Sequence, residues 1–149
     1  LAGPAASYSG KARLDGYQSV PQAAGRVYQP DLVLHCAPTA DGGAEAAEAL
    51  LAQRPDITAL FCYNDLVAVG ALRTCARRAL QVPDQIAITG FDDITIAALV
   101  NPSLTTCRVP RYDVGVQANR LLQTQINGGL CNGCEIILPV ELVVRASAP

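Results

Sequence analysis

The sequence predicts an α/β fold: a doubly wound parallel sheet with helices on both faces. Short apolar segments alternate about four times with longer segments at helical spacing, and repeated strand–helix units favour a parallel sheet. The clearest strand is 86–93, Ile-Ala-Ile-Thr-Gly-Phe-Asp-Asp, which begins as an apolar β-branched run typical of a buried strand. A chain of 149 residues that is 50% hydrophobic is long enough for one core or two small ones.

Composition excludes several classes of protein. The net charge is −2 and there is no basic stripe, so this chain by itself is not expected to bind nucleic acid. No apolar stretch reaches the length of a membrane span. Six cysteines are scattered along the chain, with Cys62 in a predicted buried strand and Cys75 on a predicted helix, which is typical of reduced thiols in a cytosolic protein. The sequence begins with Leu1 and has no methionine, which indicates a piece of a longer protein.

The first half of the chain predicts three helices, each preceded by an extended segment. Ser9 is a candidate N-cap and Gly25 a stop for the first helix, Pro55 follows the second, and Asn64-Asp65 begins the third. In order, the expected elements are the end of a strand at 1–4, helix 12–24, strand 31–35, helix 44–53, strand 56–63 and helix 66–79.

The second half begins with the strand that ends in two carboxylates. The apolar segment 94–100 follows it, and this segment is either core or a patch used for self-association. A short strand at 105–109 ends at Pro110, and the helix 112–126 comes next. The run 135–145 is extended, but proline cannot sit inside a central strand, so two short strands joined at Pro139 are expected.

Polar residues stand where the predicted strands end. Ligands of open α/β sheets bind outside the carboxyl ends of the strands, and a carboxylate there can accept hydrogen bonds from hydroxyl or ring N–H groups. Asp92 is therefore either a ligand contact or part of an Asx-type turn or helix N-cap, with equal weight from chemistry alone, and for Asp93 the cap is favoured. Asn64 is expected to cap a helix, which does not exclude a ligand contact. Arg13 opposes the helix dipole at its position, which slightly favours a role other than helix stability, but helix chemistry alone favours a solvated arginine or a surface ion pair.

No motif predicts catalysis, a cofactor or a metal. The chain has no glycine-rich phosphate loop, and its one histidine, His35, has no nucleophile or acid partner at a recognisable spacing. The lone pair Cys131-x-x-Cys134 lacks further ligands, and its Asn-Gly centre is a tight-turn signal. An aspartyl-phosphate site at Asp92 would need a cation at a strand end, whereas Lys11, the only lysine, lies at a helix start.

Four motifs occur together in the right order to resemble a known family. They are 58–61 with Asn64-Asp65 and Ala68-x-Gly70-Ala71, then 82–83 with 88–93, then 102–106, then 138–147, Leu-Pro-x-Glu-Leu-Val-Val-Arg-Ala-Ser. The combination resembles the effector-binding domain of the LacI/GalR family of bacterial transcription regulators over essentially the whole chain.

This resemblance implies the fold of type 1 periplasmic binding proteins. Two α/β subdomains are then joined by three crossover strands, with the ligand in the cleft between them. Residues 1–110 would form the C-terminal subdomain, 111–139 the final helix and strand of the N-terminal subdomain, and 140–149 the return strand.

The resemblance also implies a function. The chain would be a non-enzymatic, cytoplasmic sensor of a small metabolite, a sugar or a related compound, in a homodimeric repressor. It would need no cofactor and no membrane. Operator DNA would be bound only through an N-terminal helix-turn-helix headpiece that this sequence lacks.

The resemblance assigns roles to single residues. Arg13, Asn64 and Asp92 match effector contacts, while Asp65 and Asp93 are expected to be structural. The loop 38–41 should face the cleft, where some members place an aromatic residue and this chain has none. The residues expected at the dimer interface are Val67, Ala71, Thr74, Ile94, Ala97, Ala98 and Val100.

Two other functions are compatible with the same sequence. One is an exported periplasmic-type sugar-binding protein of the same fold, against which the six cysteines and the run from Gly90 to Thr106 speak. The other is a sugar- or phosphate-processing α/β enzyme that uses Asp92 as acid, base or nucleophile.

Overall fold

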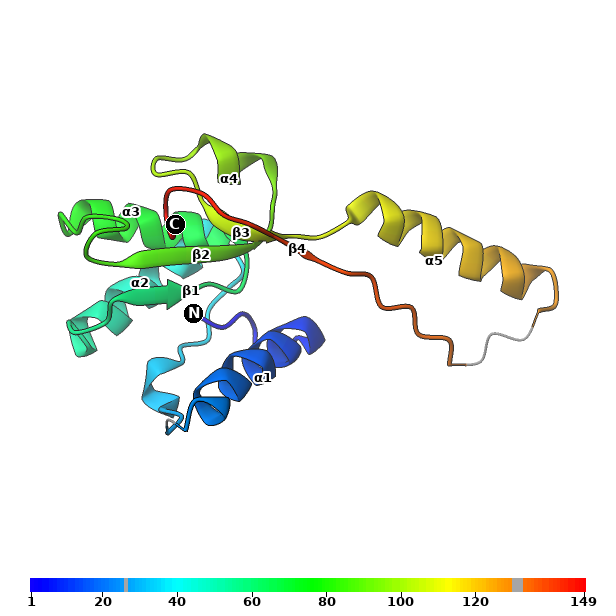
Figure 1. The fold of residues 1–149 in the computed structure, drawn as a ribbon, viewed down its shortest axis with the longest axis horizontal. Helices are drawn as coiled ribbons and strands as arrows, with labels where there is room; N and C mark the ends of the chain where they lie inside the picture. The colour runs from blue at the N-terminus through cyan, green and yellow to red at the C-terminus, as the bar shows by residue number, and fades with distance from the viewer. Residues whose placement is uncertain (26, 130–132) are drawn as a thin grey trace.

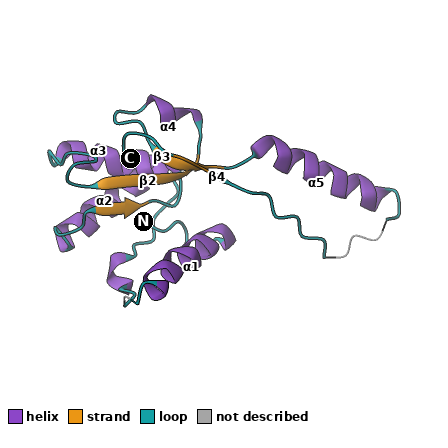
Figure 2. Cartoon of the chain, viewed as in Figure 1, coloured by secondary structure: helices purple, strands orange, loops and turns teal. Residues whose placement is uncertain are grey.

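A four-stranded sheet in the order β1-β2-β3-β4 forms the centre of the computed structural model, which describes residues 1–25, 27–129 and 133–149 (Figures 1 and 2). β1 (Ala59–Phe61), β2 (Ala87–Asp92) and β3 (Thr105–Arg108) are parallel, and β4 (Glu141–Val143) runs antiparallel to β3. The helices between the parallel strands are the crossovers that such strands require. The predicted α/β fold with a parallel sheet is therefore confirmed.

The first residues of the chain extend this sheet beyond β1. The Leu1 nitrogen donates to the Phe61 carbonyl at 2.7 Å, and the Tyr63 amide donates to the Leu1 carbonyl at 2.8 Å. On its other side, this segment forms a parallel bridge between Ala2 and His35. Because these segments run parallel, their carboxyl ends meet at one edge of the sheet.

Helices cover both faces of the sheet. α2 (Ala40–Gln53) and α3 (Asp65–Arg77) pack on the face to which Leu60 points. α1 (Tyr8–Ala23) contacts the opposite face, where Tyr17 stacks on Phe61 with 6.5 Å between ring centroids. The core between α2, α3 and the sheet includes Ala47, Leu50, Leu51, Leu60, Val67, Ala68, Ala71, Ile86, Ile88 and Leu104.

Two glycines allow α2 and α3 to approach each other closely. A Cβ atom added to Gly70 would lie 2.6 Å from the Ala44 amide nitrogen and would also meet the Ala40 carbonyl. A Cβ at Gly43 would meet the backbone of Val67. The two helices are thus in contact at backbone level, and no larger residue fits at either position.

The predicted strand 31–35 is wrong over most of its length. Pro30–Leu32 form a 3₁₀ helix, η1, with Pro30 in its first turn, and only the bridge at His35 is strand-like. Proline at the first position of a helix fixes φ and loses no hydrogen bond, which explains why the turn is favoured over a strand there.

The cap of α1 also differs from the prediction. The helix begins at Tyr8, so Ser9 lies inside it, and the Ser7 hydroxyl accepts a hydrogen bond from the Gly10 amide at 3.2 Å. For the next two helices the sequence predicted one cap, Asn64, and that one is confirmed. Thr39 caps α2, which begins four residues earlier than predicted, and Asn64 caps α3.

The sheet and the helices packed on it form one unit, which we call the α/β body. The chain leaves this body after β3 and returns to it at β4. α5 (Arg111–Ile126) projects away from the sheet and has no buried residue (Figure 1). Residues 133–140 run back beside it without forming the predicted strand before Pro139. A strand needs a partner for its backbone groups, and the described part of the chain places none alongside this segment. None of the helices in the described residues is long and apolar enough to cross a membrane.

The last residues close the core of the body. Ser147 is fully buried, and its hydroxyl donates to the Ile88 carbonyl at 2.6 Å and accepts from the Thr105 amide at 2.9 Å. The Ile88 amide donates in turn to the Ser147 carbonyl at 2.9 Å. Ser147 therefore joins β2 and β3 through backbone groups that have no other hydrogen-bond partner among the described residues.

Candidate ligand site at the carboxyl edge of the sheet

Arg13 and Asp92 lie together at the carboxyl edge of the sheet, as the sequence suggested for ligand-contacting residues. Arg13 comes from the second turn of α1 and Asp92 is the last residue of β2. The distance from Arg13 Nη2 to Asp92 Oδ1 is 3.5 Å, longer than the roughly 2.7–2.9 Å of a tight charge-assisted hydrogen bond. The two groups face each other but are not locked together, so a ligand hydroxyl can bond to both.

The Asp92 carboxylate is presented by an unusual backbone. The backbone φ angle of Asp92 is +110°, a value that residues other than glycine rarely adopt, and that of Asp93 is +50°. This turn separates the two neighbouring carboxylates and sends them to different partners. Burial raises the pKa of the Asp92 carboxyl above its ordinary value, and the nearby Arg13 guanidinium opposes that rise.

Asn64 lies at the end of the next strand but is already engaged. Its side-chain oxygen accepts a hydrogen bond from the Val67 amide at 2.9 Å, which caps α3. Its amide nitrogen is 3.5 Å from the Pro38 carbonyl, in the loop that the family resemblance led us to expect at the cleft. The cap is therefore confirmed, and Asn64 can offer a ligand chiefly the N–H groups of its amide.

Two aromatic residues that sequence reasoning missed support Arg13. Its guanidinium carbon lies 3.9 Å from the centroid of the Phe91 ring and 4.7 Å from that of Tyr63. Arg13 Nη1 also donates to the Tyr63 carbonyl at 2.8 Å. The only signal in the sequence was position: each ring comes directly before a polar residue at a strand end, Asn64 or Asp92.

Tyr63 is itself fixed by the start of α1. Its hydroxyl lies 3.0 Å from the Ser9 hydroxyl and 3.4 Å from that of Ser7. Hydrogen bonds from Ser7 and Ser9 lower the pKa of the Tyr63 phenol against the opposing effect of burial. Its ring fills the space beside Gly3, where a Cβ would lie 2.6 Å from the ring atoms.

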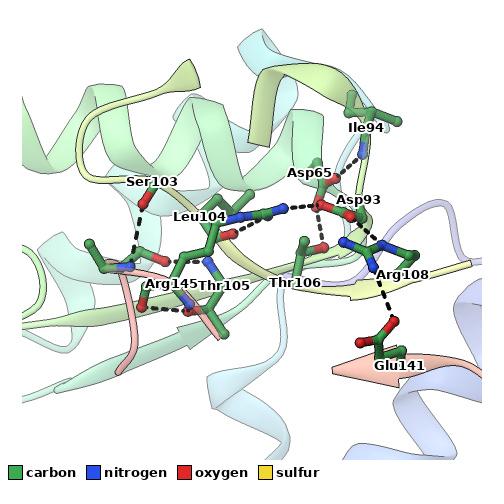
Figure 3. Close-up of polar contacts among 12 residues, drawn as sticks. Asp65, Asp93, Ile94, Ser103, Leu104, Thr105, Thr106, Arg108, Glu141 and Arg145 are labelled. Carbon is green, nitrogen blue, oxygen red and sulfur yellow. Dashed lines mark hydrogen bonds and ion pairs between the residues drawn. The ribbon is translucent and has the colours of Figure 1, made fainter. Parts of the chain in front are cut away.

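Asp93 does not cap a helix, contrary to the expectation. α4 (Thr95–Leu99) begins after Ile94, and Asp93 instead accepts from Arg108 Nε and Arg145 Nη2, each at 2.7 Å (Figure 3). Burial by itself raises the pKa of the Asp93 carboxyl, but these two arginines outweigh it and hold the pKa below its ordinary value. The structural role expected for Asp93 therefore lies in joining the two segments through which the chain leaves the body and returns.

α4 has Ile94 at its N-cap position and no side-chain cap; Asp65 instead binds the segment that leads into this helix. Asp65 Oδ2 accepts from the Ile94 amide at 2.8 Å, and Oδ1 accepts from the Thr106 hydroxyl at 2.6 Å (Figure 3). Asp65 and Thr106 are both fully buried. Burial raises the pKa of the Asp65 carboxyl, opposed by these two hydrogen bonds. Asp65 thus ties the start of α3 to β3 and to the segment after β2.

Four of the seven residues expected at a dimer interface offer no surface. Val67, Ala71, Thr74 and Ala97 are each 0% exposed, because the face of α3 that carries the first three packs against α2 and the sheet. Ile94, Ala98 and Val100 keep exposed or half-buried surface. Sequence reasoning found the apolar face of α3 but could not tell that α2 covers it.

Other candidate groups contribute little to this edge. Two hollows, of about 100 and 550 Å³, border Arg13, but neither includes Asn64 or Asp92 in its lining, which is mainly apolar. Within the described residues, no group of three or more His, Cys, Asp and Glu side chains is placed to hold a metal. The His35 ring bonds to the Gly3 carbonyl at 2.9 Å.

The expectation of reduced thiols is wrong for one cysteine. Cys134 is disulfide-bonded, while Cys131 of the same motif lies outside the described residues. The free thiols among the described residues are Cys36, Cys62, Cys75 and Cys107.

An α/β body with polar residues at the carboxyl ends of its strands, and a chain that leaves and re-enters it, defines a class of ligand-binding domain. A family model described as a periplasmic binding protein-like domain matches residues 1–148, and the chain belongs to this family. Its relatives and structural neighbours are transcription regulators of the LacI family, which are not enzymes, and the chain corresponds to part of their effector-binding domain.

Two curated relatives illustrate this similarity. The transcriptional regulator CelR of Thermobifida fusca is 35% identical over 147 residues, which cover 99% of this chain and 43% of the relative. The transcriptional repressor CytR of Escherichia coli K12 is 34% identical over 135 residues, which cover 91% of this chain and 40% of the relative. The chain spans about two fifths of the length of these relatives.

Three solved structures share the fold. A CelR–cellobiose complex matches with a TM-score of 0.96 and 34% identity over 99% of this chain and 45% of the other. A sugar-binding LacI-family regulator of Escherichia coli in complex with phosphate gives 0.89 and 30%, over 100% and 54%. A LacI-family regulator of Arthrobacter sp. FB24 in complex with lactose gives 0.84 and 27%, over 100% and 56%.

Proposed function

We propose that this chain is the effector-sensing part of a bacterial, cytoplasmic LacI-type regulator, and that it binds a sugar at the edge formed by Arg13, Asn64 and Asp92. The observation that carries the proposal is the pair of Arg13 and Asp92, which face each other at 3.5 Å. A guanidinium and a carboxylate so placed supply donors and acceptors for vicinal hydroxyls. The cellobiose and lactose named for two structural neighbours support this class of ligand.

The arrangement also suggests how binding controls DNA. In the proposal, residues 1–110 and 140–149 belong to one subdomain and 111–139 to the other, with the ligand in the cleft between them. A ligand that binds one closure state better shifts the population towards it. The change in orientation would act on operator DNA through a helix-turn-helix headpiece elsewhere in the protein. An exported binding protein lacks support, since the relatives are transcription regulators.

Asp92→Ala in the full-length protein is expected to weaken sugar binding by about 10- to 150-fold, since hydrogen bonds to a charged group contribute about 1.5–3 kcal/mol. Isothermal titration calorimetry with cellobiose, lactose, maltose, nucleosides and inorganic phosphate measures this.

The affinity of the wild type for its ligand should also fall on mild acidification. Because burial raises the pKa of Asp92, its carboxylate is protonated at a higher pH than that of an ordinary aspartate, and the ionised acceptor is then lost.

Asp56→Ala is the matched control for Asp92→Ala. Asp56 lies just before the amino end of β1, whereas the proposed site lies at the carboxyl ends of the strands. Asp56 forms a surface ion pair with Arg54 at 2.9 Å. Its loss should leave the affinity unchanged. A sugar that binds Asp92→Ala as tightly as the wild type would contradict the proposed site. Binding of nucleosides alone, or of none of these compounds, would contradict the sugar assignment.

We also propose that the protein is a homodimer that uses the surface of α4 and its flanks. Ile94, Ala98 and Val100 keep accessible surface there, and Leu99, which the sequence prediction did not include, is 72% exposed. Leu99→Glu is expected to convert a dimer to a monomer in sedimentation velocity of the full-length protein at micromolar concentration, because a charge would be buried at the contact. A wild-type monomer, or a variant that stays dimeric, would contradict this surface.

A further inference from the structure

The Arg13 guanidinium contacts the rings of Tyr63 and Phe91, which together are called the aromatic shelf. The proposed sugar site does not itself require these rings. Phe61 pairs with Thr89 in the register of β1 and β2, so that Tyr63 and Phe91, two residues further along, are neighbours on the same face of the sheet. The Arg13 guanidinium carbon lies 4.7 Å and 3.9 Å from their centroids, both within the range of cation–π attraction.

The shelf fixes the direction in which the guanidinium points. An arginine side chain has several rotatable bonds and loses about 2 kcal/mol of rotamer entropy when it is ordered. The Arg13 side chain is 19% exposed, and among the described residues its one short polar contact is with the Tyr63 carbonyl at 2.8 Å, while the contact with Asp92 is longer, at 3.5 Å. One hydrogen bond allows rotation about its axis. Contact with two rings restricts this rotation and favours the orientation in which Nη2 lies towards Asp92.

The two rings are held by different means. Tyr63 is anchored by the Ser7 and Ser9 hydroxyls at the start of the same helix that carries Arg13. Phe91 is half-buried and has no polar atom in its side chain, so its contact with Arg13 is made by the ring alone. Phe91 is therefore the position at which the effect of the shelf can be separated from other contacts.

We propose that Phe91 and Tyr63 are positioning residues of the effector site, which hold the Arg13 guanidinium in its ligand-binding orientation before the effector arrives. This inference rests on the proposed function of Arg13. A pre-ordered arginine spares the ligand the cost of ordering it, so that the rings raise affinity without touching the ligand. The rings act through Arg13, and this dependence distinguishes the proposal from direct stacking of a sugar on Phe91.

The test is a double-mutant cycle with cellobiose as the probe, measured by calorimetry on the full-length protein. Phe91→Leu should weaken binding roughly tenfold, the size of a partly desolvated cation–π contact, and Phe91→Tyr should restore it. In an Arg13→Lys background, Phe91→Leu should have far less effect, because the planar group that the ring supports is gone. Equal losses in both backgrounds would overturn the proposal in favour of direct contact or general damage to the fold.

Phe61→Leu is the matched control, because Phe61 lies on the same face but stacks on Tyr17 instead of Arg13. It should leave the affinity unchanged. A second measurement needs no ligand: the ¹⁵N order parameter of Arg13 Nε in the free protein should fall in Phe91→Leu and not in Phe61→Leu. An unchanged order parameter in Phe91→Leu overturns the proposal even if cellobiose does not bind. If the order parameter falls in Phe91→Leu but cellobiose does not bind to the wild type, the result counts against the sugar assignment alone.

Discussion

Asp65→Ala is expected to lower the free energy of unfolding by about 4 kcal/mol. Asp65 is fully buried and accepts hydrogen bonds from the Thr106 hydroxyl and the Ile94 amide. Alanine would leave both donors without an acceptor, at about 1–3 kcal/mol for each buried group, and would add a small cavity. Urea denaturation followed by circular dichroism measures the change.

Asp65→Asn separates the geometry of this residue from its charge. The amide oxygen can still accept from the Ile94 amide, and the amide nitrogen can donate to the Thr106 hydroxyl. Burial raises the pKa of Asp65 in the folded protein, so its ionised form costs stability at neutral pH, and this cost disappears as the pH falls through the folded-state pKa. Asparagine should therefore cost less than about 1 kcal/mol. A loss as large as that of alanine would show that the charge itself is required.

Gly70→Ala is expected to cost about 3 kcal/mol, although alanine is ordinarily the better helix former by about 1 kcal/mol. The added Cβ would lie 2.6 Å from the Ala44 nitrogen, and the backbone of α2 cannot move aside as a flexible side chain could. Thermal and urea denaturation should both show the loss.

Gly16→Ala in α1 is the control, because a Cβ there meets nothing within 4 Å. It should stabilise the protein by about 0.5–1 kcal/mol, the ordinary gain of alanine over glycine in a helix. If the two variants changed stability in the same direction, the close approach of α2 and α3 would not be what selects glycine at position 70.

Local patterns in the sequence predicted most of the body. The apolar run before Asp92 predicted β2, and Asn64 predicted the start of α3, because strands and helix caps depend on residues close in the chain. The strand expected at 31–35 failed because Pro30 favours a helical turn. The strand expected before Pro139 failed because strands need partners, which local sequence does not reveal.

The sequence predicted the charged residues of the candidate site, but not the aromatic residues that contact Arg13. Asp92 stood out because a carboxylate at a strand end is locally unusual. Arg13 was predicted as a ligand contact only through the family resemblance, since helix chemistry alone favoured a surface arginine. Phe91 read as an ordinary strand residue, and only the fold brings Arg13, 78 positions away in sequence, onto its ring. Arg145 and Asp93 likewise meet across 52 positions, a pairing that no local pattern contains.

The position of Ser147 has a consequence for synthesis on the ribosome. Ile88 and Thr105 are translated well before Ser147, and the 39 residues that follow Arg108 must be added before its hydroxyl and carbonyl reach them. At about 5–20 residues per second, this delay lasts roughly 2–8 s. During that interval β2 and β3 lack their last partners and β4 does not yet cover the edge of β3. The nascent body is then open at this edge, which makes it a substrate for chaperones and a site for pairing with other unfinished chains.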